Sequence, residues 1–259
     1  MNNCKLKVFG IIPARYASKR FPGKPLAKLG EHTMIEWVYR RALKAFDTVV
    51  VATDDERIAE EVRIFGGQAV MTSSEHLSGT DRCAEALAQI QEKIGVKADV
   101  VVNVQGDEPF VEPELLARLV ECFNDKTTQI ATVVKPFENR ADLFNPNHVK
   151  TVMTETGRAI YFSRSPIPYI RDLAQEEWLN QHTFFWHLGL YAYRADVLLK
   201  LTQLKPSSLE IAESLEQNRW IENDFSIQII QTKGENIAVD TPEDLIIAQR
   251  IVSNMKLNF

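Results

Sequence analysis

Residues 11–26 read IIPARYASKRFPGKPL, and the interpretation of the whole chain starts from this stretch. The apolar residues 8–12 predict a short buried strand, which we expect to end at Pro13 because proline cannot donate a backbone hydrogen bond. The loop that follows is strongly basic, although the formal net charge of the protein is −5. Its prolines and Gly23 stiffen the backbone and allow it to approach a ligand closely. The loop predicts a site for a polyanion such as a triphosphate, and the alternative is a solvated basic turn. Its cations are Arg15, Lys19, Arg20, Lys24 and Lys28.

The loop does not follow the glycine spacing of a Walker A motif or of a dinucleotide fingerprint, so it supports neither an ATPase nor an NAD enzyme. The composition is that of an ordinary soluble protein. A chain of 259 residues that is 45% hydrophobic and 25% charged suits one large domain, with or without a modest appendage. A pI near 5.6 argues against nucleic acid as a partner.

The cysteines, Cys4, Cys83 and Cys122, are far apart and form no C-x-x-C pair. They predict neither a zinc site nor a disulfide framework. The apolar patch near the N-terminus is interrupted too early, at Pro13, for a secretory signal or a membrane span. We therefore expect a cytoplasmic protein with no membrane partner.

The first part of the chain alternates strand and helix signals. Helical spacing predicts a helix over 33–46 that Thr33 caps, followed by a β-branched strand over 48–52. A second helix, a weak strand over 68–71 and a third helix ending near residue 93 follow. This order predicts an α/β fold with a mostly parallel sheet.

The apolar run 99–104 predicts a central strand that is covered on both faces. It is followed by Gln105-Gly106-Asp107-Glu108-Pro109, and open α/β sheets bind ligands at this end of their strands. Asp107 is the first candidate for Mg²⁺ coordination, because a carboxylate suits this hard cation, and Glu108 is the second. The alternative is that both residues only form a turn before the next helix.

Ser78-Gly79-Thr80 precedes a predicted helix, where the serine or threonine could cap the helix or the free N–H groups could meet a ligand. Further on, 155–194 predicts a β-rich insertion that contains His187 in an apolar strand, where a structural histidine is the alternative to a functional one. A helix is predicted over 207–220. Near the end, Thr241 can cap a last helix, which leaves Asp240 free for another function.

The pattern I-P-A-R-Y-x-S-x-R-x-P-G-K-P-L resembles the N-terminal signature of 3-deoxy-manno-octulosonate cytidylyltransferases, and a looser form is shared by other sugar nucleotidyltransferases. The resemblance covers residues 8 to about 250. It implies that Arg15 and Lys24 contact the CTP phosphates, and that Ser18 and Arg20 line the same loop. It also implies further CTP contacts from Ser78, Gly79, Thr80 and Gln105.

Four later motifs resemble the same family. H-L-G-x-Y-x-Y-R and F-S-R-x-x-I-P imply that His187, Tyr191 and Arg164 contact the sugar acid, with Arg164 suited to grip its carboxylate. L-E-Q implies the same for Glu216 and Gln217. V-D-T-P-E-D-L implies that Asp240 is the second carboxylate on the Mg²⁺ bound by Asp107.

The resemblance implies a Rossmann-like nucleotidyltransferase domain over 1–259, with a β-rich insertion at about 155–220 for substrate binding and dimerisation. The implied reaction joins CTP and octulosonate to give CMP-octulosonate and pyrophosphate for lipopolysaccharide biosynthesis. The aromatic segment 184–194 makes a homodimer reasonable. The alternatives are the same transfer to 8-amino-octulosonate or sialic acid, and a catalytically silent nucleotide-binding relative.

Overall fold

The computed structural model describes residues 6–17, 20–234 and 238–254. The chain divides into two compact units, of which the first holds residues 1–120 and 235–259 and the second holds residues 121–234. Within the described ranges, none of the helices combines the length and the apolar character that crossing a membrane requires.

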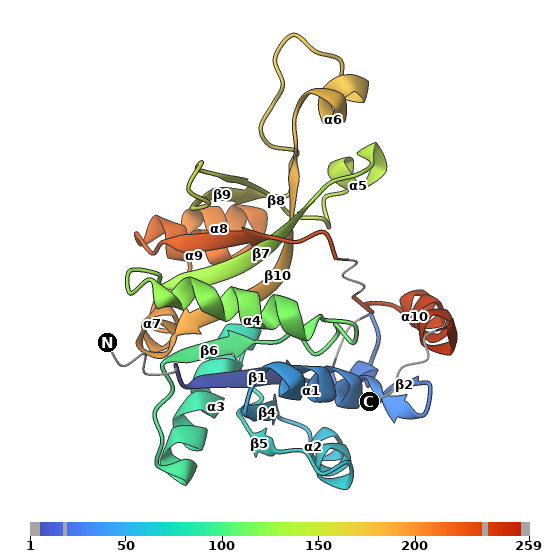
Figure 1. Cartoon of the computed structure of the whole chain (residues 1–259), viewed down its shortest axis with the longest axis vertical. Helices are drawn as coiled ribbons and strands as arrows, with labels where there is room; N and C mark the ends of the chain where they lie inside the picture. Colours follow the sequence, from blue (N-terminus) through green and yellow to red (C-terminus); the bar gives the residue numbers. More distant parts are fainter. Residues whose placement is uncertain (1–5, 18–19, 235–237, 255–259) are drawn as a thin grey trace. The chain divides into compact units, whose positions relative to one another are not determined.

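The first unit contains a parallel sheet with the strand order β6-β1-β4-β5 (Figure 1). The bounds of its strands are β1 Val8–Ala14, β4 Thr48–Thr53, β5 Ala69–Met71 and β6 Val100–Asn103. These strands are rich in β-branched residues, and β6 is buried along its whole length. This order places β1 next to both β4 and β6, so that its carboxyl end lies between the ends of two neighbours.

Helices connect these strands. They are α1 Met34–Ala45, α2 Glu56–Ile64 and α3 Gly79–Ile94, and α4 Pro113–Glu121 follows β6. Since β5 and β6 lie on opposite sides of β1, right-handed crossovers put α1 and α2 on one face of the sheet and α3 on the other. The apolar side of α1, including Trp37 and Val38, is buried.

A short 3-10 helix, Lys24–Leu26, and the hairpin of β2 Lys28–Leu29 and β3 His32–Thr33 precede α1. The last helix, α10 Pro242–Asn254, packs near β2. A separate apolar cluster joins these parts of the first unit, and its buried members are Leu29, Met34, Trp37, Phe110, Val239 and Ala248. The C-terminal segment of the unit is thereby fixed beside its N-terminal loop.

The second unit contains a mixed sheet. Its strands run in the order β11-β7-β10, with β7 parallel to β11 and antiparallel to β10, and β8 joins β10 to β9. Their bounds are β7 Ile130–Pro136, β8 Lys150–Met153, β9 Ala159–Ser163, β10 Phe185–Arg194 and β11 Ile227–Gln231. Its helices are α5 Arg140–Phe144, α6 Trp178–Gln181, α7 Ala195–Leu201, α8 Ser208–Glu213 and α9 Glu216–Glu222.

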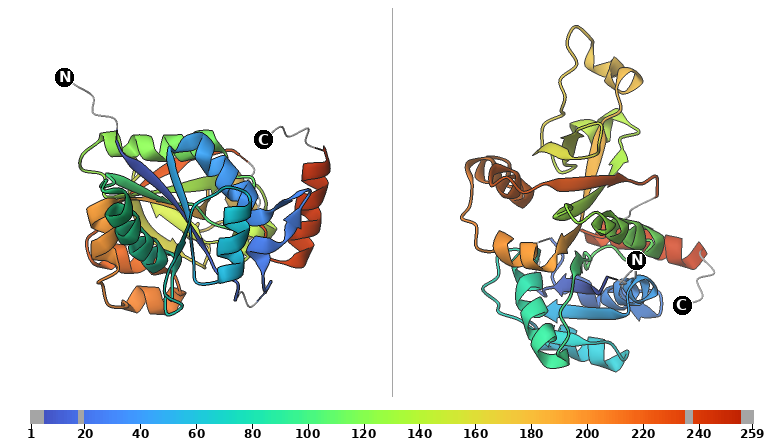
Figure 2. Two further views of the ribbon diagram at one scale, coloured as in Figure 1. Left: turned by 90° about the horizontal axis from the view of Figure 1, so that it is seen from below. Right: turned by 60° about the vertical axis from the view of Figure 1, so that its left-hand side comes forward.

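Within the second unit, the segment that carries α6 extends beyond α5 (Figures 1 and 2). An apolar cluster of Phe137, Leu143, Trp178 and Phe184 stabilises this part of the unit. The insertion predicted at about 155–220 lies inside this unit, which begins earlier, at Glu121.

The α/β fold predicted from the sequence is confirmed, with four local corrections. The strand β1 continues through Pro13 to Ala14, beyond its expected end. The helix predicted over 207–220 is two helices, α8 and α9, because Ser214 has a φ of 52°. Thr33 precedes α1, but its side chain makes no capping hydrogen bond. The sequence also predicts a strand over 237–240 before the last helix, but Ile237 lies outside the described residues and 238–240 are irregular.

Candidate active site

The basic loop leaves the carboxyl end of β1 and folds back on itself. Gly23 donates a backbone hydrogen bond to the carbonyl oxygen of Tyr16 at 2.9 Å. Gly23 has a φ of 72°, and a Cβ atom there would lie 3.1 Å from the Tyr16 ring. Glycine is therefore required where the loop turns into the 3-10 helix that begins at Lys24. The side chain of Lys24 is 14% exposed, whereas Arg15 and Arg20 are exposed.

Two aspartates that are far apart in the sequence meet beside this loop. Asp107 follows β6 in the turn Gln105-Gly106-Asp107. Its carbonyl oxygen accepts a hydrogen bond from the backbone N–H of Val239 at 2.9 Å, which places Asp240 next to it. The N–H of Asp240 donates to the Asp244 carboxylate at 3.0 Å, so the start of α10 holds Asp240 in place. As predicted, Thr241 caps this helix, because its hydroxyl accepts from the N–H of Asp244.

Lys24 joins the two aspartates. Its Nζ lies 2.7 Å from Oδ2 of Asp107 and 3.1 Å from Oδ1 of Asp240. Arg20 adds a second cation, with its Nη2 3.1 Å from the other carboxylate oxygen of Asp240. Both carboxylates are partly exposed, at 29% and 37% of the side-chain surface. The site therefore alternates negative and positive groups at the carboxyl ends of β1 and β6.

These side chains line a pocket of about 260 Å³ in the first unit. Most of the described residues that were predicted to bind CTP line it, and Ser18 lies outside the described residues. Thr80 is the exception, since it is 3% exposed inside α3 and is not part of the lining. The lining residues are Pro13, Ala14, Arg15, Arg20, Lys24, Pro25, His76, Leu77, Ser78, Gly79, Arg82, Gln105, Gly106, Asp107 and Asp240.

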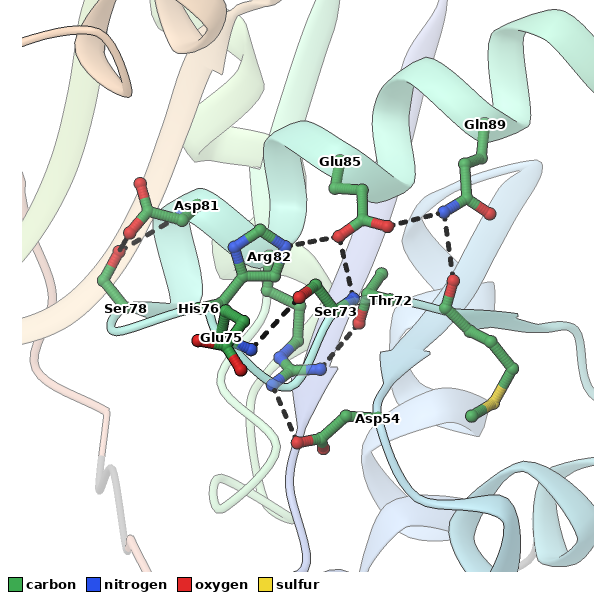
Figure 3. Close-up of polar contacts among 11 residues, drawn as sticks. Asp54, Thr72, Ser73, Glu75, His76, Ser78, Asp81, Arg82, Glu85 and Gln89 are labelled. Atoms are coloured by element: carbon green, nitrogen blue, oxygen red, sulfur yellow. Dashed lines mark hydrogen bonds and ion pairs between the residues drawn. The ribbon is translucent and has the colours of Figure 1, made fainter.

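Ser78 is the N-cap of α3. Its Oγ accepts a hydrogen bond from the N–H of Asp81 at 3.1 Å and donates to the Asp81 carboxylate at 2.9 Å (Figure 3). The capping function considered for the Ser-Gly-Thr motif is thus present. Ser78 and Gly79 also line the pocket, so capping does not exclude contact with a ligand.

The lining also includes His76, Leu77 and Arg82, which the sequence analysis did not assign to the site. Arg82 is 4% exposed, and its guanidinium donates to Thr72 Oγ1 at 2.6 Å and lies 3.4 Å from the carboxylate of Asp54. A buried arginine needs polar partners such as these, because an unpaired buried charge is costly. In the sequence, only the presence of an arginine next to the Ser-Gly-Thr motif indicated that a charged group lies here.

Glu85 on α3 holds the loop that carries His76. Its Oε2 accepts from the N–H of Ser73 at 2.9 Å and pairs with Nε2 of His76, and its Oε1 accepts from Gln89 at 2.9 Å (Figure 3). Partial burial by itself raises the pKa of Glu85, but the bonds from Ser73 and His76 outweigh it and lower this pKa. The carboxylate is therefore charged at neutral pH and anchors this wall of the pocket.

The residues predicted to bind the sugar acid belong to the second unit. Arg164 uses its guanidinium on main-chain carbonyls, with Nε 2.7 Å from Glu213 O, Nη1 3.0 Å from Pro146 O and Nη2 3.3 Å from Ser214 O. Among the described residues, these bonds engage three of its five N–H groups, and the other two could bind a carboxylate. The sequence did not predict these contacts.

His187 and Tyr191 are both 7% exposed, and their ring centroids are 5.2 Å apart. Burial lowers the pKa of His187 to about 3 and raises that of Tyr191 well above its ordinary value. Glu216 pairs with Arg219 at 3.0 Å, and Gln217 is 6% exposed. The structure therefore brings His187 and Tyr191 together, and it places Glu216 and Gln217 in the first turn of α9.

Comparison with known proteins adds to this geometry. A family model described as cytidylyltransferase matches residues 9–233. A 3-deoxy-manno-octulosonate cytidylyltransferase of Parabacteroides distasonis is 54% identical over 253 residues, which are 96% of this chain and 99% of the relative. One from Bacteroides thetaiotaomicron is 53% identical, with 96% and 99% of the two chains covered.

Solved structures are also similar. A CMP:2-keto-3-deoxy-manno-octonic acid synthetase complexed with CTP superposes with a TM-score of 0.87 at 39% identity, and 96% of this chain and 99% of that chain are covered. A cytidylyltransferase from Leptospira borgpetersenii has a TM-score of 0.61 at 17% identity, with 97% and 89% covered, which is a similarity of fold alone.

Proposed function

This chain belongs to the family of 3-deoxy-manno-octulosonate cytidylyltransferases, and from this premise we propose that it transfers CMP from CTP to 3-deoxy-manno-octulosonate. The observation that carries the proposal is the meeting of Lys24, Asp107 and Asp240 in one pocket. Two carboxylates joined to a basic loop suit a triphosphate and a cation together, whereas simple binding of an anion would not require the carboxylates.

In this proposal, the basic loop binds the phosphates of CTP. Arg15 and Lys24 contact them directly, and Arg20 adds positive charge at the same edge of the pocket. Ser78 and Gly79 bring the N-terminus of the 16-residue helix α3 to the pocket, and Gln105 lines it beside them. These contacts support a nucleotide at this position, because a helix N-terminus and cations both favour a negative ligand.

Asp107 and Asp240 would hold Mg²⁺. They fit this ion because their oxygens already converge on one cation, the Lys24 ammonium. In the described part of the chain, no three His, Cys, Asp or Glu side chains are grouped to hold a metal. Two carboxylates suffice for Mg²⁺, which usually takes its other ligands from water and substrate phosphates. When bound, the ion supplies a Lewis acid that neutralises charge on the phosphate oxygens.

The transfer exchanges one phosphorus–oxygen bond for another. The anomeric hydroxyl oxygen of octulosonate bonds to the α-phosphorus of CTP and releases its proton to solvent, and the bond from that phosphorus to the pyrophosphate oxygen breaks. Arg15 and Lys24 stabilise the charge that gathers on pyrophosphate as it leaves. In the second unit, the other two N–H groups of Arg164 would bind the sugar carboxylate, and His187, Tyr191, Glu216 and Gln217 would bind its hydroxyls.

Pyrophosphate release from CTP and octulosonate, with and without Mg²⁺, tests the reaction. We expect Asp107→Asn and Asp240→Asn to abolish turnover while the protein remains folded by circular dichroism. Full activity in either variant would remove that residue from the site. A panel with 8-amino-octulosonate and sialic acid tests the choice of sugar acid, and equal kcat/KM values would contradict the assignment to octulosonate.

We also propose that the protein acts in the cytoplasm as a homodimer. The three cysteines of the sequence are far apart and form no C-x-x-C pair, which agrees with a reducing compartment. Trp178 and Phe184 are buried within the second unit, but Tyr169, whose ring contacts Trp178, is 74% exposed and gives this segment an apolar surface suited to subunit contact. Light scattering of the purified protein would show twice the mass of 29.5 kDa, and a monomer at assay concentration would refute the dimer.

A further inference from the structure

The hydroxyl of Thr132 lies at the centre of a buried polar cluster in the second unit. Thr132 is on β7 and has an exposed fraction of 0%. Its Oγ1 lies 2.8 Å from the carbonyl oxygen of Leu190 and 3.0 Å from Nε2 of His187. Both partners belong to β10, which also carries Tyr191.

The two contacts determine which nitrogen of His187 carries the proton. A hydroxyl has one hydrogen, and the carbonyl of Leu190 can only accept, so Thr132 donates to Leu190. The contact with His187 then requires Nε2–H to donate to the hydroxyl oxygen. Because burial lowers the pKa of His187 to about 3, the ring is neutral near pH 7 and Nδ1 keeps a free lone pair.

The same hydroxyl holds an irregular part of β10. His187 pairs with Val134 but Tyr191 pairs with Thr132, so β10 has two more residues than β7 between these pairs. Gly189, with a φ of 75°, lies in this bulge. In a regular strand, residues four positions apart are about 13 Å apart, whereas the ring centroids of His187 and Tyr191 are separated by 5.2 Å. The bulge therefore brings the two rings together, and the hydroxyl of Thr132 binds the carbonyl oxygen of Leu190 within it.

We propose that Thr132 is a positioning residue for the sugar acid. Its hydroxyl fixes His187 as the Nε2–H tautomer and holds the bulge beside Tyr191, so that Nδ1 of His187 accepts a hydrogen bond from a hydroxyl of octulosonate. The inference rests on the proposed function, which assigns His187 and Tyr191 to this substrate. A purely structural threonine would support the strands without affecting the affinity for the sugar acid.

Three variants separate these two functions of the hydroxyl. Thr132→Val removes it at nearly constant volume, and Thr132→Ser restores it. Thr151→Val is the matched control, because Thr151 is 1% exposed in the same unit and donates to the carbonyl of Tyr161 at 2.9 Å, without a histidine partner. We expect Thr132→Val to raise KM for octulosonate about tenfold, as for a lost hydrogen bond. KM for CTP should be unchanged, and both the serine variant and the control should behave like the wild type.

The tautomer is measured without substrate by ¹⁵N NMR of histidine-labelled protein, with His187→Gln used to assign the signal. The wild type should show a protonated Nε2 and an unprotonated Nδ1, and Thr132→Val should lose this preference. A protonated Nδ1 in the wild type would overturn the proposal even if the valine variant failed to fold. An unchanged KM for octulosonate in a folded Thr132→Val, or an equal rise in the Thr151→Val control, would also overturn it. If the wild type did not turn over octulosonate, the proposed function would fail while the tautomer result stood.

Discussion

Replacing Lys24 with methionine removes the ammonium that pairs with both aspartates and keeps a side chain of similar length. The two ion pairs, at 2.7 Å to Asp107 and 3.1 Å to Asp240, are partly exposed. Pairs of this kind contribute roughly 1 kcal/mol each, so the variant leaves the carboxylates short of about 2 kcal/mol of compensation. If these carboxylates hold Mg²⁺, a divalent cation that binds the wild type must first displace Lys24, whereas in the variant it does not have to break these two ion pairs. Without nucleotide, we therefore expect the variant to bind the metal about 30-fold more tightly than the wild type.

Binding of Mn²⁺ as a substitute for Mg²⁺, followed by electron paramagnetic resonance of the free ion, measures this change in nucleotide-free protein. Lys28→Met is the matched control, since Lys28 belongs to the same basic segment but is exposed and does not line the pocket. The same Lys24→Met variant should lose most turnover, because it can no longer contact the phosphates. An affinity for Mn²⁺ that is unchanged or weaker than that of the wild type would refute the shared metal site, whatever the effect on activity.

Two further predictions concern other charged groups. Glu85→Gln should raise KM for CTP several-fold and leave KM for octulosonate unchanged, because the loop that carries His76 loses its charged anchor. Steady-state kinetics measure this change, with Glu92→Gln as the control, since Glu92 is exposed on the same helix. A KM for CTP equal to that of the wild type would contradict the prediction. Lys150 is fully buried, and burial lowers its pKa from 10.5 to about 8. Above pH 8 the unfolded chain therefore binds more protons than the folded protein, and stability rises with pH. Between about pH 7.5 and about pH 9.5, the free energy of unfolding of the wild type relative to Lys150→Met should rise by about 2 kcal/mol in urea titrations. A fall over this range would contradict a lowered pKa of Lys150.

The parts of the fold that follow from local pattern could be predicted, and the parts that depend on distant partners could not. The run 100–104 that precedes the turn of Asp107 is apolar except for Asn103, so a buried strand was the simplest interpretation. Pro13 continues β1 because it lies beyond the last pairing with β6, where a missing N–H costs little. The end of α8 at Ser214 could not be predicted from the local sequence. The carbonyl oxygen of Ser214 accepts a hydrogen bond from Arg164, which is distant in the sequence and follows β9.

The same distinction applies to the candidate site. The basic loop and Asp107 stand out in the sequence because charge gathers where a strand ends. That Asp107 and Asp240 lie side by side could be expected only through the resemblance. The backbone hydrogen bond from Val239 to Asp107 that brings them together cannot be predicted from the spacing of residues in the sequence. His76 was missed for a related reason: its anchor, Glu85, is an ordinary helix residue until the fold brings the loop to it.

The arrangement of charges in the pocket has a consequence for the order of binding. Arg20 and Lys24 are paired with the carboxylates, so CTP that binds as proposed would compete with Asp107 and Asp240 for these cations. A divalent cation bound by the two aspartates would likewise displace Lys24. If nucleotide and metal bound together, the phosphates would receive the lysine and arginine, and the carboxylates would receive the metal. We therefore expect the pocket to favour a metal–nucleotide complex, because only the two together would leave no charge unpaired.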